Sequence, residues 1–213
     1  MYFYPFENFD INDEKKKLEC KEYILSNKNR INEPVGYFYD FVTTSLHSAI
    51  TSIPDHSIVE IVNCLLDNGA DINIKKDKDS VDDTVDDNYG STPLIYAAKL
   101  SKLPVVKLLI NRGADLHLKK YQGNTALLEA VAWLAHLEII KLLLDSGANI
   151  NDTNIDGNNA LMIFITKWLE RLPAEIYTYK NPNYIKYGTD VIDLLVERKI
   201  QINNENMSSN YYR

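Results

Sequence analysis

Hydrophobic residues recur every three or four positions in several short stretches of the chain, with polar residues between them. The stretches 94–98, 105–109, 127–131 and 139–143 each place apolar side chains on one face of a helix. The stretches form pairs, and the second stretch of each pair is followed by a glycine, a residue that commonly ends a helix. The pattern therefore predicts paired short helices, each pair packing on the next.

A longer motif repeats across these stretches. Gly90-Ser-Thr-Pro-Leu94 returns as Gly123-Asn-Thr-Ala-Leu127, so the two glycines, at 90 and 123, are 33 residues apart. A partial copy at Thr44-Ser-Leu-His-Ser-Ala49 precedes them, and another at Gly157-Asn-Asn-Ala-Leu161 follows. A 33-residue period with Thr-Pro-Leu-His-x-Ala near its start is the signature of ankyrin repeats. The chain therefore resembles the ankyrin-repeat family.

The resemblance implies an all-α fold, a solenoid of helix-turn-helix units with β-hairpin-like finger loops. About four repeats are expected, after an N-terminal partial capping repeat that keeps the end of the stack soluble. We expect the outer helix of the last repeat to span Asp190 to Lys199 and the acidic insertion to be mobile. The expected division is an N-terminal extension at 1–12, the partial capping repeat at 13–36, repeat 1 at 37–87 with an acidic finger insertion at 75–87, repeat 2 at 88–120, repeat 3 at 121–154, a divergent C-terminal repeat at 155–203 with a Tyr-rich insertion at 173–188, and a tail at 204–213.

Composition limits the kinds of partner and of cellular compartment that we expect. A net charge of −7 and a pI near 5.1 disfavour nucleic acid, because binding to phosphates depends largely on basic side chains. Two cysteines without a CxxC pair give neither a disulfide framework nor a zinc site. Neither a signal peptide nor a run of ~20 apolar residues is present, so we expect a soluble intracellular protein, cytoplasmic or nuclear. Richness in Asn, Lys, Ile and Tyr favours an AT-biased genome, such as that of a large DNA virus or a parasite; a viral protein would act in the host cell.

No catalytic residue, metal site or cofactor is predicted. His47 stands at the histidine of the family motif, where the resemblance implies an imidazole bonded to the neighbouring finger backbone. A metal role for it would need three or four converging ligands. The acidic run 77–87 lacks the glycine and the closing glutamate of an EF-hand, which favours a solvated loop. An enzyme remains the least favoured alternative, with the Tyr-rich insertion as the one segment where a pocket is imaginable.

The resemblance also implies a concave surface, formed by finger tips and inner helices, that binds a protein partner. The chain would then be a non-catalytic scaffold or adaptor, with a monomer favoured and a host protein as partner if the source is viral. Four aromatic residues of this surface would line up across successive units, either as interface anchors or packed against neighbouring fingers. The implied partner-binding residues are Phe41, Tyr89, Ser91, Lys99, Leu100, Tyr121, Gln122, Asn124, Trp133, Asp156 and Asn158.

A second function stays open beside the scaffold. Asn73 and Asn151 occupy the position that the asparaginyl hydroxylase of ankyrin repeats attacks, and Asn203 matches it more weakly. The chain would then be a substrate or decoy of that enzyme. Addition of one oxygen at Asn73 or Asn151, detected by mass, is the expected signature.

Overall fold

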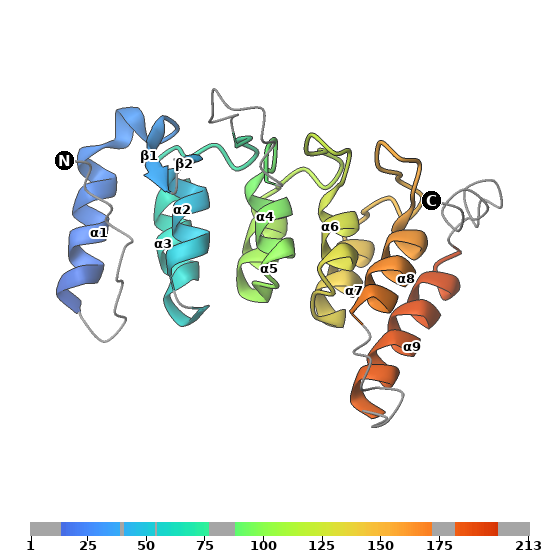
Figure 1. Cartoon of the computed structure of the whole chain (residues 1–213). Coiled ribbons are helices and arrows are strands. Elements are labelled where there is room, and N and C mark those ends of the chain that lie inside the picture. Colours follow the sequence, from blue (N-terminus) through green and yellow to red (C-terminus); the bar gives the residue numbers. More distant parts are fainter. Residues whose placement is uncertain (1–13, 39–40, 54, 77–87, 172–181, 200–213) are drawn as a thin grey trace.

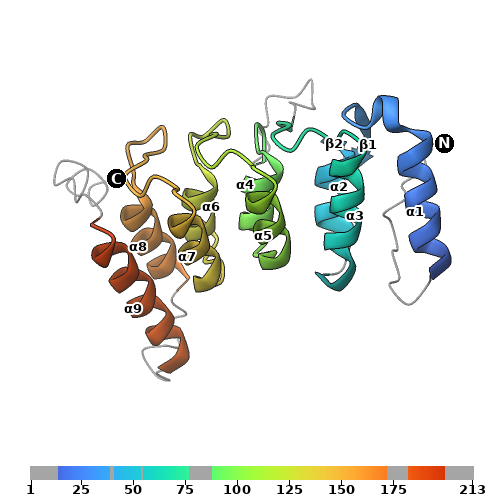
Figure 2. The same cartoon turned by 180° about the vertical axis from the view of Figure 1, so that it is seen from behind.

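The helices of the chain stand in one row, and the hairpins that connect successive pairs project from the same end of it (Figures 1 and 2). This computed structural model describes residues 14–38, 41–53, 55–76, 88–171 and 182–199. The elements are α1 (Glu14–Ser26), a 3-10 turn η1 (Lys28–Arg30), β1 (Pro34–Phe38), β2 (Phe41–Thr44), α2 (Ser45–Ser52), α3 (Asp55–Asp67), α4 (Pro93–Lys99), α5 (Leu103–Asn111), α6 (Ala126–Ala132), α7 (Leu137–Asp145), α8 (Ala160–Glu170) and α9 (Pro182–Glu197).

The helices form two packed layers. The first helices of the pairs stack as α2, α4, α6 and α8, and the second helices stack as α3, α5, α7 and α9, with α1 on α3. We call them the inner and outer helices. The apolar residues predicted to face inward do so: Ala97, Ala98 and Ala130 are fully buried and allow close approach of neighbouring inner helices. The predicted helical solenoid is confirmed, and its finger before α2 is a true antiparallel hairpin of β1 and β2.

Each inner helix starts at a side-chain cap. The hydroxyls of Thr44, Thr92 and Thr125 accept a hydrogen bond from the backbone N–H three residues on. Asn159 does the same at the start of α8 with its amide oxygen. The cap satisfies one of the free N–H groups at a helix start, so the repeated Thr or Asn sets where every inner helix begins.

The finger loops are joined to one another by backbone hydrogen bonds. The Tyr121 N–H donates to the Tyr89 carbonyl at 3.1 Å, and the Ile155 N–H donates to the Gln122 carbonyl at 3.2 Å. Gly123 lies at the second of these contacts with a positive φ of +79°, and a Cβ there would meet the Ile155 nitrogen at 2.7 Å. This glycine therefore serves both the turn and the close approach of the next finger.

Gly123→Ala is expected to lower the free energy of unfolding by about 2 kcal/mol, more than Gly113→Ala, which should cost about 1 kcal/mol. Gly113 is the matched control because its φ is +84° and a Cβ at this position would meet nothing within 4 Å. Only Gly123→Ala adds a backbone clash to the left-handed conformation. Urea unfolding followed by circular dichroism measures both, and equal losses would refute the role of finger contact.

The last outer helix begins earlier than predicted. Helix α9 starts at Pro182 and not at Asp190, so residues 182–188 of the predicted Tyr-rich insertion are helical. The predicted insertion ended at Gly188, which lies inside α9, and a Cβ at this position would overlap the ring of Trp168. The added turns are stabilised because the Tyr184 hydroxyl donates to the Trp168 carbonyl at 3.3 Å and the Tyr187 hydroxyl donates to that of Ala135 at 2.6 Å.

The predicted capping repeat is represented by α1, which packs on α3 through buried Cys20 and Ile24. Asn32 joins the cap to repeat 1: its side chain donates to the Gly69 carbonyl at 3.0 Å and accepts from the Asp71 N–H at 2.7 Å. The N-terminal extension at 1–12, the tail at 204–213 and residues 77–87 of the acidic insertion lie outside the described residues. The expected mobility of that insertion therefore stays a prediction.

Candidate protein-binding surface

His47 is an internal structural residue. Its side chain is 1% exposed. Nε2 lies 3.0 Å from the Ser91 carbonyl, which can only accept, so Nε2 carries the proton. Nδ1 lies 2.9 Å from the Thr44 hydroxyl, which donates to it. Burial, with a contribution from the nearby Lys76 charge, lowers the pKa of His47 to about 4. The predicted bond from His47 to the neighbouring finger backbone is confirmed.

A second internal polar cluster lies one repeat further on. Lys120 and Glu129, both almost fully buried, form an ion pair with 2.7 Å between Nζ and Oε1. The amide of Asn124 donates to the same carboxylate oxygen at 2.7 Å. Among the described residues, Glu129 Oε2 and Asn124 Oδ1 are buried and have no hydrogen-bond partner. A carboxylate in the middle of an otherwise apolar helix was the sequence signal for this cluster, and the sequence interpretation missed it.

Two residues of the predicted partner-binding set are corrected by their burial. Ser91 is 1% exposed and Asn124 is 9% exposed. Ser91 lies under the finger, where its carbonyl accepts from His47 and from the Lys76 N–H. Asn124 turns inward to Glu129. Neither side chain is available to a partner, because both are buried.

The finger tips carry two tyrosines that contact each other. The rings of Tyr89 and Tyr121 are 5.2 Å apart between centroids and tilted by 41°. Tyr89 is half-buried, whereas Tyr121 remains 60% exposed. The two rings therefore pack between neighbouring fingers, and Tyr121 still presents most of its surface to solvent. Their role as interface anchors stays a prediction.

Trp133 lies between two cations at the ends of the inner helices. The Lys99 ammonium is 4.4 Å and the Arg171 guanidinium 5.5 Å from its ring centroid. Arg171 Nη1 also donates to the Trp133 carbonyl at 3.1 Å. Leu100, Trp133 and Arg171 are the C-terminal capping residues of α4, α6 and α8, and the first two have exposed fractions of 38% and 40%. Arg171 was not predicted, because α8 has 11 residues against 7 in α4 and α6 and so leaves the repeat register.

The other predicted partner-binding residues are placed as follows. Asp156 is exposed, and Gln122 and Asn158 are half-buried. The backbone N–H groups of Asp156 and Asn158 donate to the Asn154 side chain, which shapes the last finger. Phe41 begins β2, and its side chain lies outside the described part of the structure.

Comparison with known protein families fits this architecture. A family model described as ankyrin repeats in three copies matches residues 75–154, and a model of the single ankyrin repeat matches residues 43–77. The chain belongs to the ankyrin-repeat family. The two matches together cover repeats 1 to 3, where the Thr caps, the finger contacts and the buried histidine occur.

Individual relatives are similar to this chain over less than half of its length. The putative ankyrin repeat protein FPV233 of Fowlpox virus (strain NVSL) is 34% identical over 91 residues, which are 42% of this chain and 16% of that protein. The B-cell lymphoma 3 protein homolog of Mus musculus is 36% identical over 87 residues, 41% of this chain and 16% of that protein. The chain thus matches less than a fifth of the length of each relative.

A solved structure extends the likeness of fold to most of the chain. The crystal structure of an ankyrin repeat domain from Acinetobacter baumannii AYE aligns with a TM-score of 0.62 and 22% identity. The alignment covers 88% of this chain and 78% of that one. At this identity the likeness supports the ankyrin fold alone.

The asparagines predicted as hydroxylation sites lie in the turns after the outer helices of their ankyrin repeats. Asn73 is half-buried, and its side-chain oxygen accepts from the Asp115 N–H of the next repeat at 2.9 Å. The Asn151 N–H donates to the Asn149 side chain at 3.1 Å. Asn203 lies outside the described residues. Hydroxylation at these positions stays a prediction.

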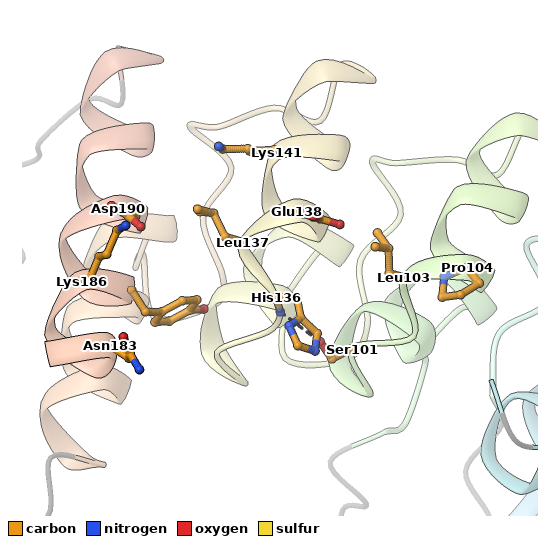
Figure 3. Close-up of a pocket in the computed structure, with 11 residues that line it drawn as sticks. Ser101, Leu103, Pro104, His136, Leu137, Glu138, Lys141, Asn183, Lys186 and Asp190 are labelled. Atoms are coloured by element: carbon orange, nitrogen blue, oxygen red, sulfur yellow. Dashed lines mark hydrogen bonds between the residues drawn. The ribbon is translucent and has the colours of Figure 1, made fainter. Parts of the chain in front are cut away.

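A trough with a volume of about 720 Å³ lies on the side of the outer ankyrin helices (Figure 3). Leu103 and Pro104 of α5, Leu137 and Glu138 of α7, and Tyr187 of α9 contribute to its wall. Burial raises the pKa of the Tyr187 phenol, whose proton is donated to the Ala135 carbonyl. Among the described residues, no hydrogen bond or ion pair joins the acidic and basic side chains of the trough to one another.

Three further properties of the described residues bear on function. None of their helices is both long and apolar enough to cross a membrane. No group of three or more His, Cys, Asp and Glu side chains within the described part is arranged to hold a metal ion. Cys20 and Cys64 are free thiols, the first buried and the second half-buried.

Proposed function

We propose that this ankyrin-repeat chain is a non-catalytic scaffold that binds a protein partner through the finger tips and the C-terminal ends of its inner helices. We call this surface the concave face. The observation that carries the proposal is the exposure of two large aromatic side chains, Tyr121 and Trp133, from one repeat. Ankyrin repeats generally mediate protein–protein interaction, which supports the same function. The exposed or half-buried residues of the concave face are Tyr89, Lys99, Leu100, Tyr121, Gln122, Trp133, Asp156, Asn158 and Arg171.

The aromatic residues of the concave face are held in place before a partner arrives. Tyr121 rests on Tyr89, and Trp133 is fixed between Lys99 and Arg171. A side chain that is already ordered loses little conformational entropy on binding, and that loss costs about 0.5–1.5 kcal/mol for each immobilised side chain. Tyrosine, tryptophan and arginine are also the residues enriched at the energetic centres of interfaces. The concave face therefore has both the residue types and the rigidity of an interface.

The double variant Tyr121→Ala/Trp133→Ala is expected to weaken partner binding at least about tenfold, because truncating central aromatic residues removes about 1 kcal/mol or more each. Its stability should change little, since both side chains are partly solvated. The measurement is affinity capture by the immobilised full chain from host-cell extract, read by mass spectrometry, and then titration of the captured protein.

The matched control is Ile185→Ala/Val196→Ala, which truncates two exposed apolar residues of the outer helix α9. A partner of the concave face is a protein retained by the wild type and by this control but lost from the Tyr121/Trp133 variant. If all three chains retain the same proteins equally, the concave face is not the binding surface.

A further inference from the structure

The concave face contains a group of cations around its exposed tryptophan. Lys99, Trp133 and Arg171, together with Leu100, form what we call the basic-aromatic patch. It lies on three successive inner helices, because Leu100, Trp133 and Arg171 cap the C-terminal ends of α4, α6 and α8. The helix dipole alone favours cations at such ends. It does not account for a tryptophan 40% exposed between them.

The positive charge of the patch contrasts with the charge of the chain. The whole sequence has 30 Asp and Glu against 23 Lys and Arg, a net charge of −7. Glu170 is the acidic neighbour of Arg171 in sequence, and its carboxylate is paired with Lys167 at 2.8 Å. Within the described residues, the Arg171 side chain makes one hydrogen bond, from Nη1 to the Trp133 carbonyl. Its remaining N–H groups keep the planar fork with which arginine binds a carboxylate.

Lysines also lie on the fingers next to the patch. The Lys99 ammonium donates to the Asn88 side chain at 2.6 Å, next to Tyr89 at the finger tip. A hollow of about 270 Å³ lies between the adjoining fingers, and its lining contributes four lysines and two tyrosines. Of these lysines, Lys75 and Lys119 are exposed and extend along the fingers, where each ammonium donates to a backbone carbonyl of the next repeat. The lining residues are Lys75, Lys76, Tyr89, Gly90, Lys119, Lys120 and Tyr121.

We propose that the partner segment bound by the concave face is an acidic peptide with an apolar residue beside its carboxylates. One carboxylate binds the Arg171 fork, the apolar side chain packs on Trp133 and Leu100, and a further carboxylate lies toward the finger lysines. This inference rests on the proposed scaffold function and adds the chemistry of the partner. A basic peptide is repelled by the patch.

The test starts from a random 12-residue peptide library displayed on phage and selected on the full chain. Enriched sequences are expected to carry Asp or Glu next to an apolar residue. One enriched peptide, synthesised with a fluorophore, is then titrated by fluorescence anisotropy. We expect Lys99→Gln/Arg171→Gln to weaken its binding about tenfold, and 0.5 M salt to weaken it further, because exposed charges are screened at that ionic strength.

Lys107→Gln is the matched charge control. Lys107 is exposed on the outer helix α5, and its loss makes the chain more negative without touching the concave face. Arg171→Lys is a second control, which keeps the charge but loses the fork, and its affinity should lie between those of the wild type and Arg171→Gln. Circular dichroism of each variant verifies folding.

The outcomes separate the two proposals. Enriched peptides without excess acid that still depend on Tyr121 and Trp133 would refute the acidic-partner inference and leave the scaffold function in place. Peptides that depend on neither pair of residues would refute both. Equal weakening by Lys107→Gln, or preferential binding of a single-stranded oligonucleotide over the acidic peptide, would also overturn the inference.

Discussion

Replacing Glu129 with leucine is expected to lower the free energy of unfolding by about 3–5 kcal/mol, a large fraction of the stability of a domain. The side chains of Glu129 and Lys120 are both almost fully buried, with 2.7 Å between their charged atoms. The leucine removes the carboxylate that balances the Lys120 ammonium and receives the Asn124 amide. A buried charge without its counter-charge carries a large desolvation cost.

The double variant Lys120→Met/Glu129→Leu should recover most of that loss. The native pair is incompletely satisfied among the described residues, since Glu129 Oε2 and Asn124 Oδ1 have no hydrogen-bond partner. Apolar residues of similar volume often replace such a pair at little cost. Urea unfolding of the wild type, the two single variants and the double variant gives the coupling energy directly. Additive losses in the double variant would show that the two charges do not act as a pair.

The repeat frame could be predicted because it rests on local signals. The Thr caps and the glycine turns are each specified by a few neighbouring residues and recur with a 33-residue period, and the structure places α4 and α6 where the motif puts them. The role of His47 followed for the same reason, since the motif places its ring under the next finger. Local capping and packing thus agree with the global stack.

The concave face could be predicted only in outline. A repeat register identifies equivalent positions, but it does not say which way a polar side chain turns. Ser91 and Asn124 were therefore predicted as exposed, and instead they satisfy buried groups under the fingers. Asn124 turns inward because its repeat has a glutamate in the inner helix, where repeat 2 has Tyr96.

The last repeat departs further from the prediction because it is shaped by contacts between residues distant in sequence. Trp168 stacks on Phe164 and on Tyr184, and its ring fills the space beside Gly188. These contacts extend α8 and begin α9 early. The longer α8 places Arg171 next to Trp133. This contact joins the last repeat to repeat 3, and no periodic motif predicts it. The part of the surface with the most distinctive chemistry is thus the part that deviates from the repeat.

His47 is expected to make the stability of the chain depend on pH near neutrality. The folded-state pKa of about 4 lies below the usual 6.5 of histidine, so between these values the unfolded chain binds a proton that the folded chain does not. The stabilisation is fully present above about pH 6.5 and is lost as the pH falls toward 4. The loss amounts to about 3 kcal/mol in total and about 2 kcal/mol by pH 5.

The geometry explains why His47 stays unprotonated in the folded chain. Nε2 already uses its hydrogen on the Ser91 carbonyl, so a second proton would have to sit on Nδ1, facing the Thr44 hydroxyl. That hydroxyl also accepts the capping N–H of His47 at 3.5 Å and cannot serve both donors well. The charged ring would in addition be buried near Lys76.

His47→Gln is the control, since an amide can donate to Ser91 but does not titrate. Urea unfolding at pH 7.5, 6 and 5 should show the wild type losing about 2 kcal/mol more than the variant over this range, because the two chains differ in no other titratable group. Parallel pH curves for the two chains would contradict the assignment, and with it the view that this imidazole stays neutral to join inner helix and finger.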